Sequence, residues 1–132
     1  MGANRILCID DEEFCIASIR AILFKLGIDV ENEVDFCING QEAISMAEES
    51  KKYGINYAII LTDFNMPLMD GVEATKKLRK VLGDKPVIVG VTGYATSKYH
   101  KIGREVGMNE VIAKPVYVST LREILRKYYN KK

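Results

Sequence analysis

Five polar residues stand at the ends of four apolar stretches, and their side chains together could hold a metal ion and a phosphoryl group. Asp10 and Asp11 follow "ILCI", Asp63 follows "AIILT", Thr92 ends "VIVGVT" and Lys114 follows "EVIA". Taken singly, each has an ordinary structural explanation, because aspartate and threonine can cap helices or turns and a lysine can simply be solvated. If the four stretches lie side by side, however, three carboxylates, a hydroxyl and an ammonium converge on one cleft.

Three carboxylates held close together repel one another and need a compensating cation. Mg²⁺ prefers oxygen ligands, keeps several waters, and commonly takes one or two carboxylates plus phosphate oxygens. We therefore expect Mg²⁺, with Mn²⁺ able to take its place. A soft-metal site is not indicated, because His100 is the only histidine and Cys8, Cys15 and Cys37 are scattered along the sequence.

Asp63 is the candidate nucleophile of this group. An ionised carboxylate is a weak nucleophile, but an acyl phosphate can form when the donor is already activated and a metal neutralises charge during in-line transfer. Lys114 and Thr92 would then face the phosphoryl oxygens, which suit both an ammonium and a hydroxyl donor.

The elements that must position these residues alternate regularly along the chain. Short runs rich in Val and Ile predict five strands: Arg5 to Asp10, Glu33 to Ile38, Tyr57 to Asp63, Val87 to Gly93, and Glu110 to Lys114. Helical patterns lie after them: Glu13 to Leu26, Gln41 to Lys52, Gly71 to Leu82, Ser97 to Val106, and Ser119 to Tyr129. This order predicts a parallel sheet with helices on both faces, which binds ligands at the carboxyl ends of its strands.

Glycines indicate where two of these helices end, but the sequence does not decide at which residue the last helix begins. Gly27 and Gly107 follow the last apolar positions of their helices, as helix-stopping glycines do. Thr120 with Glu123 would form a capping box for the final helix, but Tyr117 or Ser119 could also begin it.

Composition fits one globular domain, which we place at residues 1–132 with a core at about 4–129. The 132 residues are 48% hydrophobic and 28% charged, and the net charge of +1 gives no bias toward nucleic acid or membrane. No apolar run approaches the roughly 18 residues that span a bilayer, and the charged start does not suit a signal peptide. The three cysteines are expected to be buried thiols in a reducing cytosol, which predicts a cytoplasmic location.

Four linked motifs give the sequence a close resemblance to the receiver (response regulator) domains of two-component phosphorelays. They are "ILCIDDEE", "LTDFNMPLMDG", "VIVGVTGYA" and "GMNEVIAKPV", in the order and at the distances typical of that family over nearly the whole chain. The resemblance implies a doubly wound, flavodoxin-like α/β fold. Its single five-stranded parallel sheet would have the order 2-1-3-4-5, with helices on both faces.

The resemblance also implies the roles of individual residues. Asp63 would be the phosphoacceptor, Asp11 and Asp63 would bind Mg²⁺ through their carboxylates, and Asp10 would act largely through metal-bound water. The backbone carbonyl of Asn65 would complete the protein ligands of the metal.

Two further residues would contact the phosphoryl group after transfer. Thr92 and Lys114 would bond its oxygens, and the peptide between Lys114 and Pro115 is expected to be cis, as in the family. The turn from Asn65 through Pro67 would aim a carbonyl at the metal, and the acid after it, Asp70, is expected to cap the next helix.

Such domains accept phosphate from a histidine kinase or a histidine phosphotransfer protein and act as signalling switches rather than as enzymes on separate metabolites. The surface expected to change comprises the helix Ser97 to Val106, the strand Glu110 to Lys114 and the last helix. We expect a monomer or a weak phosphorylation-dependent dimer without direct contact to nucleic acid. The stretch "GMNEVIAKPV" resembles the receiver domains of hybrid kinases more than it resembles free-standing response regulators.

Two positions depart from the family pattern. Val111 stands where an aromatic switch residue is common, so a swinging ring at that position is not expected. Tyr94, two places after Thr92, can influence the access of water to an acyl phosphate.

Three other classes of protein fit these residues less well. A haloacid dehalogenase-like aspartyl-phosphate hydrolase needs a second acid two places after its nucleophile, where this chain has Asn65. A calcium loop starting at Asp63 would have Pro67 at its fifth position and lacks the required glycine at Leu68. A scaffold of the same fold that works without phosphorylation usually lacks an acid, the threonine or the lysine, and this chain keeps them all.

Overall fold

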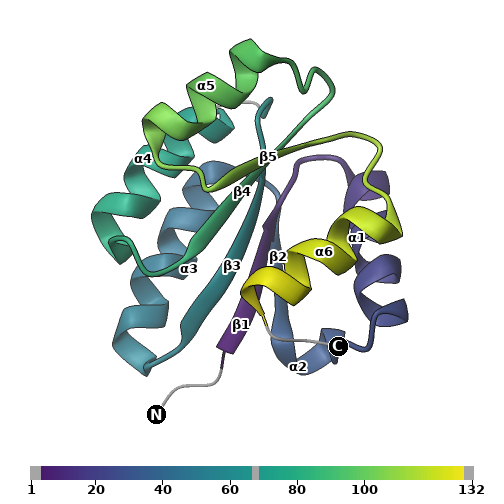
Figure 1. The fold of residues 1–132 in the computed structure, drawn as a ribbon. Helices are drawn as coiled ribbons and strands as arrows, with labels where there is room; N and C mark the ends of the chain where they lie inside the picture. Colours follow the sequence, from purple (N-terminus) through teal and green to yellow (C-terminus); the bar gives the residue numbers. More distant parts are fainter. Residues whose placement is uncertain (1–3, 67–68, 130–132) are drawn as a thin grey trace.

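Five parallel strands form one sheet in the computed structural model, which describes residues 4–66 and 69–129. The strands are β1 (Asn4–Ile9), β2 (Val34–Cys37), β3 (Asn56–Asp63), β4 (Val87–Thr92) and β5 (Glu110–Ala113). Their order is β2-β1-β3-β4-β5, as Figure 1 shows, so the predicted sheet is confirmed. Each predicted strand end lies within one residue of the observed end.

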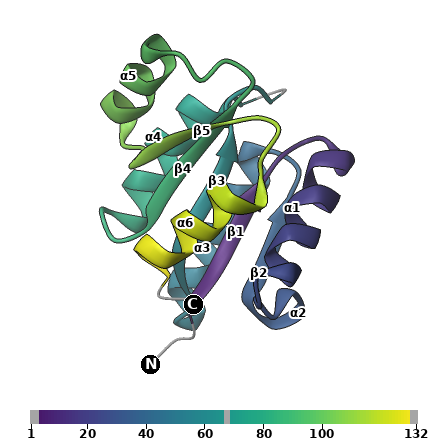
Figure 2. The ribbon, with the colours of Figure 1, turned by 45° about the vertical axis from the view of Figure 1, so that its right-hand side comes forward.

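Helices cover both faces of this sheet (Figures 1 and 2). They are α1 (Glu13–Lys25), α2 (Val30–Glu33), α3 (Gly40–Tyr53), α4 (Gly71–Leu82), α5 (Ser97–Val106) and α6 (Val118–Tyr128). Helices α1 and α6 pack on one face, and α3, α4 and α5 pack on the other. The hydrophobic core is therefore split into two layers by the sheet.

Alternate residues of the central strands supply these two layers, because successive side chains of a strand point to opposite faces. On β1, Ile6 and Cys8 pack toward α1 and α6, whereas Leu7 and Ile9 pack toward α3 and α4. All four side chains are buried. Because helices cover both faces of the sheet, the strand sequences are continuous apolar runs and do not alternate between apolar and polar residues.

The short helix α2 was not predicted, and the prediction that the second strand begins at Glu33 was wrong. The backbone N–H of Glu33 donates to the carbonyl of Asp29 at 2.7 Å, and its carboxylate accepts from the N–H of Asp29 at 3.0 Å. These two bonds close one helical turn, so Glu33 ends α2 and the strand starts at Val34.

Helix ends agree with the glycine pattern and decide the question left open for the last helix. Gly27 and Gly107 follow α1 and α5 with φ of 92° and 110°, a backbone region that glycine adopts most easily. Tyr117 is the N-cap of α6, and its side chain makes no capping hydrogen bond. Of the three starts left open by the sequence, the helix therefore uses Tyr117, and Thr120 with Glu123 does not form its cap.

The cysteines are all free thiols, but they differ in burial. Cys8 and Cys37 are buried, as predicted. Cys15 is only partly buried, so that prediction was wrong for it, because it lies on the first turn of α1 where the helix leaves the edge of the sheet. Within residues 4–66 and 69–129, no helix has the length and apolarity needed to cross a bilayer.

Candidate functional site

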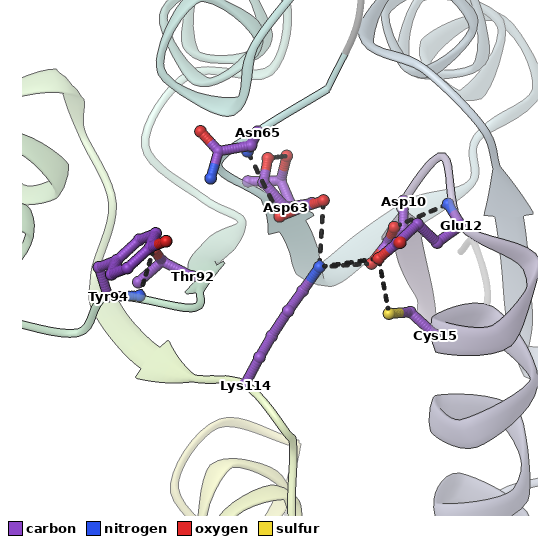
Figure 3. Close-up of polar contacts among 9 residues, drawn as sticks. Asp10, Glu12, Cys15, Asp63, Asn65, Thr92, Tyr94 and Lys114 are labelled. Carbon is purple, nitrogen blue, oxygen red and sulfur yellow. Dashed lines mark hydrogen bonds and ion pairs between the residues drawn. The ribbon is translucent and has the colours of Figure 1, made fainter.

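The carboxyl ends of β1, β3 and β5 bring four charged side chains to one edge of the sheet. Asp10 and Asp11 follow β1, Asp63 is the last residue of β3, and Lys114 follows β5. Carboxylate oxygens of the three aspartates all lie within 4.8 Å of one another. Figure 3 shows the Lys114 side chain reaching from β5 toward Asp10 and Asp63.

Lys114 is the cation that this acidic cluster faces. Its Nζ lies 3.2 Å from Asp63 Oδ2, 3.4 Å from Asp10 Oδ2 and 3.7 Å from Glu12 Oε1. Glu12 was not among the predicted site residues. The only signal for it was the unbroken acidic run from Asp10 through Glu12 that follows the first strand.

Burial sets the electrostatics of the cluster. Burial of Asp63 raises the pKa of its carboxyl group, the nearby charge of Asp10 raises it further, and Lys114 only partly offsets these effects. Burial alone lowers the pKa of the Lys114 ammonium, but the charges of Asp10 and Asp63 outweigh it and leave that pKa raised. The site therefore carries more negative charge than its single ammonium balances.

Asp10 has a buried oxygen that lacks a hydrogen bond. Its Oδ1 accepts from the backbone N–H of Glu12 at 2.9 Å, but Oδ2 has no hydrogen-bond partner among the described residues. Buried polar atoms normally have a partner, so an orphan of this kind needs an explanation. A bound cation or its water would supply one.

The backbone after Asp63 turns back over its carboxylate. The N–H of Asn65 donates to Asp63 Oδ1 at 3.3 Å, and Figure 3 shows the two residues side by side. The predicted continuation of this turn through Pro67 lies outside the described residues.

Asp70 and Gly71 position the helix that follows. Asp70 caps α4, because its carboxylate accepts from the N–H of Glu73 at 2.9 Å, as predicted. The N–H of Gly71 donates to the carbonyl of Phe64 at 2.9 Å. A Cβ at Gly71 would lie 2.2 Å from the carbonyl oxygen of Asp63, so only glycine allows the helix to approach this closely.

Thr92 ends β4 and is completely buried. Its Oγ1 accepts from the backbone N–H of Tyr94 at 3.1 Å, and Figure 3 shows these two residues on the side of the site away from Asp10. Its backbone carbonyl accepts from the N–H of Lys114 at 2.8 Å, which ties β4 to the segment that carries the lysine. The peptide between Lys114 and Pro115 is cis, as predicted.

An aromatic contact path that sequence reasoning missed runs from the site to α5. Phe64, next to Asp63, meets Tyr99 edge to face with ring centroids 5.6 Å apart, and Tyr99 stacks with Tyr94 at 6.3 Å. Val111, at the position where an aromatic residue was considered, is buried. The aromatic side chains of this path are therefore supplied by the residue after β3, by α5 and by the loop between β4 and α5.

Asp63→Asn is expected to stabilise the metal-free protein at neutral pH. Because the Asp63 pKa is raised in the folded state, stability falls as the pH rises from the ordinary carboxyl pKa through the raised one. Asparagine stays neutral, so urea unfolding should show the variant more stable at neutral pH and the difference vanishing below the ordinary pKa. Asp70→Asn, which changes an exposed helix cap outside the acidic cluster, is the control. A variant that is less stable than the natural chain at neutral pH would contradict the proposed repulsion.

Comparison with known proteins gives one consistent family. The sequence model of the response regulator receiver domain matches residues 6–126. Two-component response regulator 24 of Arabidopsis thaliana is 36% identical over 121 residues, which are 92% of this chain and 81% of that protein. The osmosensing histidine protein kinase SLN1 of Saccharomyces cerevisiae is 32% identical over 124 residues, which are 94% of this chain but only 10% of the kinase.

A solved structure with the same fold also resembles this chain. The receiver domain of the sensor histidine kinase PA1611 from Pseudomonas aeruginosa was crystallised with a magnesium ion coordinated in its active-site cleft. It superposes with a TM-score of 0.80 and 28% identity, covering 98% of this chain and 99% of that one. Together with the β2-β1-β3-β4-β5 sheet and the acidic edge, these matches show that the chain belongs to the response regulator receiver domains of two-component signal transduction.

Proposed function

We propose that this chain is a phosphoacceptor switch that takes a phosphoryl group from a phosphohistidine partner onto Asp63 in the presence of Mg²⁺. The observation that carries the proposal is the position of Asp63 between two other carboxylates and the Lys114 ammonium, which lies 3.2 Å from its Oδ2. A nucleophilic oxygen, an anion-binding cation and a place for a divalent metal are the parts that phosphoryl transfer to a carboxylate needs.

The residues of the acidic edge fit a hard divalent ion. Asp11 and Asp63 would bind Mg²⁺ through their carboxylates, Asn65 through its backbone carbonyl, and Asp10 through metal-bound water; Mn²⁺ could replace Mg²⁺. The close approach of the three carboxylates and the unbonded Oδ2 of Asp10 support this assignment. The ion would neutralise charge on the carboxylates and on the incoming phosphoryl group.

The transfer itself uses side chains of this chain. An Asp63 carboxylate oxygen attacks phosphorus in line, its O–P bond forms as the P–N bond of the donor breaks, and the leaving imidazole keeps the electron pair. Lys114 then bonds the phosphoryl oxygens in place of the carboxylate oxygen that it now contacts. Thr92 would turn from the N–H of Tyr94 and donate its hydroxyl proton to the same group.

Loss of the hydrogen bond from the Tyr94 N–H to the Thr92 hydroxyl would connect phosphorylation to the surface formed by α5, β5 and α6. The N–H of Tyr94 loses its acceptor, so the loop from Gly93 to Thr96 can adopt a second arrangement. The ring of Tyr94 stacks on Tyr99 of α5, and Tyr99 in turn contacts Phe64 beside the phosphoacceptor. This packing offers a route that does not need an aromatic ring at Val111.

The partners proposed for the chain follow from the same chemistry. A histidine kinase or a histidine phosphotransfer protein would supply the phosphoryl group, and the similarity to part of a histidine kinase, SLN1, supports this class of donor. We further propose one domain over residues 1–132 with its core at about 4–129, working in the cytoplasm as a monomer or weak phosphorylation-dependent dimer. It would support only its own phosphorylation and dephosphorylation.

Incubation with Mg²⁺ and a small phosphodonor tests the proposal. Intact-protein mass spectrometry should show the mass of one added phosphoryl group, and chelation of the metal before the donor is added should prevent it. A chain that stays unmodified in Mg²⁺ under conditions that phosphorylate another receiver domain would contradict the proposal.

Lys114→Ala is expected to separate metal binding from switching. Removing the ammonium leaves the carboxylates in place, so Mg²⁺ affinity should stay the same or increase, while the phosphoryl group loses its counter-charge and the switched state is impaired. Mg²⁺ titration and spectra of the phosphorylated chain would measure the two effects separately. Lys127→Ala, which removes a surface ion pair with Glu110, is the control. Equal loss of metal binding and switching would be evidence against this role.

A further inference from the structure

The two ends of α5 are held by different kinds of contact. The helix packs against α4 and β5, as Figures 1 and 2 show. Its carboxyl end runs into Gly107, which lies beside Arg79 of α4. Its amino end follows the loop that carries Tyr94, whose N–H bonds to Thr92 of the site.

The guanidinium of Arg79 binds the carboxyl end of α5. Its Nε and Nη2 donate to the carbonyl of Gly107 at 3.0 and 2.8 Å, and Nη2 also donates to Asn109 Oδ1 at 2.8 Å. Its Nη1 donates to the carbonyls of Gly83 and Pro86 at 3.0 and 2.8 Å. One side chain of α4 therefore joins the end of its own helix, the residue before β4 and the end of α5.

These bonds of Arg79 do not compete with an ion pair. Within residues 4–66 and 69–129, the guanidinium forms no ion pair with a carboxylate. Hydrogen bonds from a charged donor are stronger than neutral ones, and carbonyls at the carboxyl end of a helix attract a cation. Gly107 allows the approach, because its φ is 110° and a Cβ there would lie 3.1 Å from Arg79 Cγ.

Close packing and a second pair of hydrogen bonds hold the same end of α5. Asn109 Oδ1 accepts from the N–H of Ile88 at 2.8 Å, and the N–H of Asn109 donates to the carbonyl of Ile88 at 2.7 Å. Met108 is buried, and its N–H donates to the carbonyl of Gly103 at 2.8 Å. A Cβ at Gly103 would lie 2.6 Å from Val111 Cγ2, so α5 and β5 leave no free space at this point.

The amino end of α5 is held only by weaker contacts. The side chain of its N-cap, Thr96, makes no capping hydrogen bond, and the first two helical residues are exposed. Tyr99 contacts Phe64 and Tyr94 through its ring. The buried residue of the helix, Gly103, lies in the carboxyl half.

We propose that α5 pivots about its carboxyl end when the switch operates, and that Arg79 is the positioning residue that fixes this pivot. The inference rests on the proposed function, in which the bond from the Tyr94 N–H to Thr92 is lost at the amino end. A helix that is held at one end and released at the other tilts, and does not shift as a whole. Residues 103–110 would therefore keep their positions while the amino half of α5 moves.

The pivot restricts where a partner could recognise the switched state. The carboxyl end of α5 would look the same before and after phosphorylation. A partner that distinguishes the two states through this helix would have to contact its amino half, where Lys98 and Lys101 are exposed.

Amide hydrogen exchange followed by peptide mass spectrometry tests the pivot in the full chain. Phosphorylation with Mg²⁺ and a small phosphodonor should change exchange over residues 94–102 by about 5-fold or more, as expected for one lost hydrogen bond, and leave residues 103–110 unchanged. Thr92→Val removes the acceptor of the Tyr94 N–H without phosphorylation and should speed exchange over residues 94–102 alone.

Arg79→Met tests the role of the guanidinium, because it keeps an apolar stem and removes every donor. In the unphosphorylated variant, exchange over residues 103–110 should be at least about 10-fold faster, since bonds from a charged donor are lost. After phosphorylation, the change should extend from residues 94–102 into 103–110. Lys80→Met, at the next and exposed position of α4, is the matched control and should keep the natural pattern. Asn109→Ala, which removes one bond to the guanidinium, is the second variant if Arg79→Met does not fold.

The results that would overturn the pivot differ from those that would overturn the phosphoacceptor function. An equal change over residues 94–102 and 103–110, in the phosphorylated natural chain or in Thr92→Val, would show that α5 moves as a whole. Unchanged exchange over residues 103–110 in Arg79→Met, or faster exchange throughout the sheet, would show that Arg79 does not fix the pivot. If the natural chain takes up no phosphoryl group while both variants behave as expected, the pivot stands and the phosphoacceptor function falls.

Discussion

Asp63→Ala is expected to abolish Mg²⁺-dependent incorporation of the phosphoryl group. The substitution removes the attacking oxygen and one proposed metal ligand together, while Asp10 and Lys114 remain in place. Intact mass after incubation with Mg²⁺ and a small phosphodonor should show only the unmodified chain. This is the largest functional effect that any single substitution in the site should have, because Asp63 is the proposed nucleophile and its Oδ2 is also the carboxylate oxygen nearest to the Lys114 ammonium, at 3.2 Å, among the described residues.

Asp70→Ala is the matched control, since it removes another acid from the same segment without touching the cluster. It should keep full incorporation while costing about 1 kcal/mol of stability, because only the cap bond to the N–H of Glu73 is lost. Incorporation that survives in Asp63→Ala would place the phosphoacceptor elsewhere. Incorporation lost in both variants would indicate unfolding, which a circular dichroism melt would show.

Gly71→Ala is expected to be the most damaging small substitution for the geometry of the site. The added Cβ would lie 2.2 Å from the carbonyl oxygen of Asp63 and 2.9 Å from the Cα of Phe64, and both are backbone atoms that cannot rotate away. We expect a loss of about 1–3 kcal/mol in the free energy of unfolding, as for other overpacked sites. Phosphorylation should also slow, because the clash displaces the residue that carries the nucleophile.

Urea unfolding and the rate of phosphoryl incorporation would measure the two consequences. Gly93→Ala is the control for stability, because a Cβ there meets nothing within 4 Å and should change stability by no more than about 0.5 kcal/mol. An unchanged free energy of unfolding and an unchanged rate of phosphoryl incorporation in Gly71→Ala would show that α4 can move away from β3 without loss of stability. The close approach of α4 would then have no role in the site.

The fold could be predicted from the sequence because its strands are buried on both faces. Val and Ile runs such as Val87 to Thr92 have no other simple explanation in a domain of this size, and polar residues mark where every strand except the second leaves the core. Convergence of Asp10, Asp63 and Lys114 then follows from parallel strands sharing one edge. The cap at Asp70 was predictable because it depends on residues three apart.

Features that depend on contacts between distant elements could not be predicted in this way. The path from Phe64 through Tyr99 to Tyr94 joins the turn after β3, a helix and a second loop, whose relative positions only the folded chain defines. The steric demand at Gly71 depends on how closely α4 approaches β3, and a glycine after an aspartate is compatible with an ordinary turn. Partial exposure of Cys15 likewise depends on how α1 leaves the sheet edge.

The most direct test of the account is the position of the phosphoryl group. After phosphorylation with Mg²⁺ and a small donor, borohydride reduction converts an aspartyl phosphate into homoserine, and peptide mass spectrometry locates the converted residue. We expect conversion at Asp63 alone, and none when the metal is chelated first. Conversion at Asp10, Asp11 or Glu12 would contradict it, as would a phosphoryl group that resists borohydride and therefore is not an acyl phosphate.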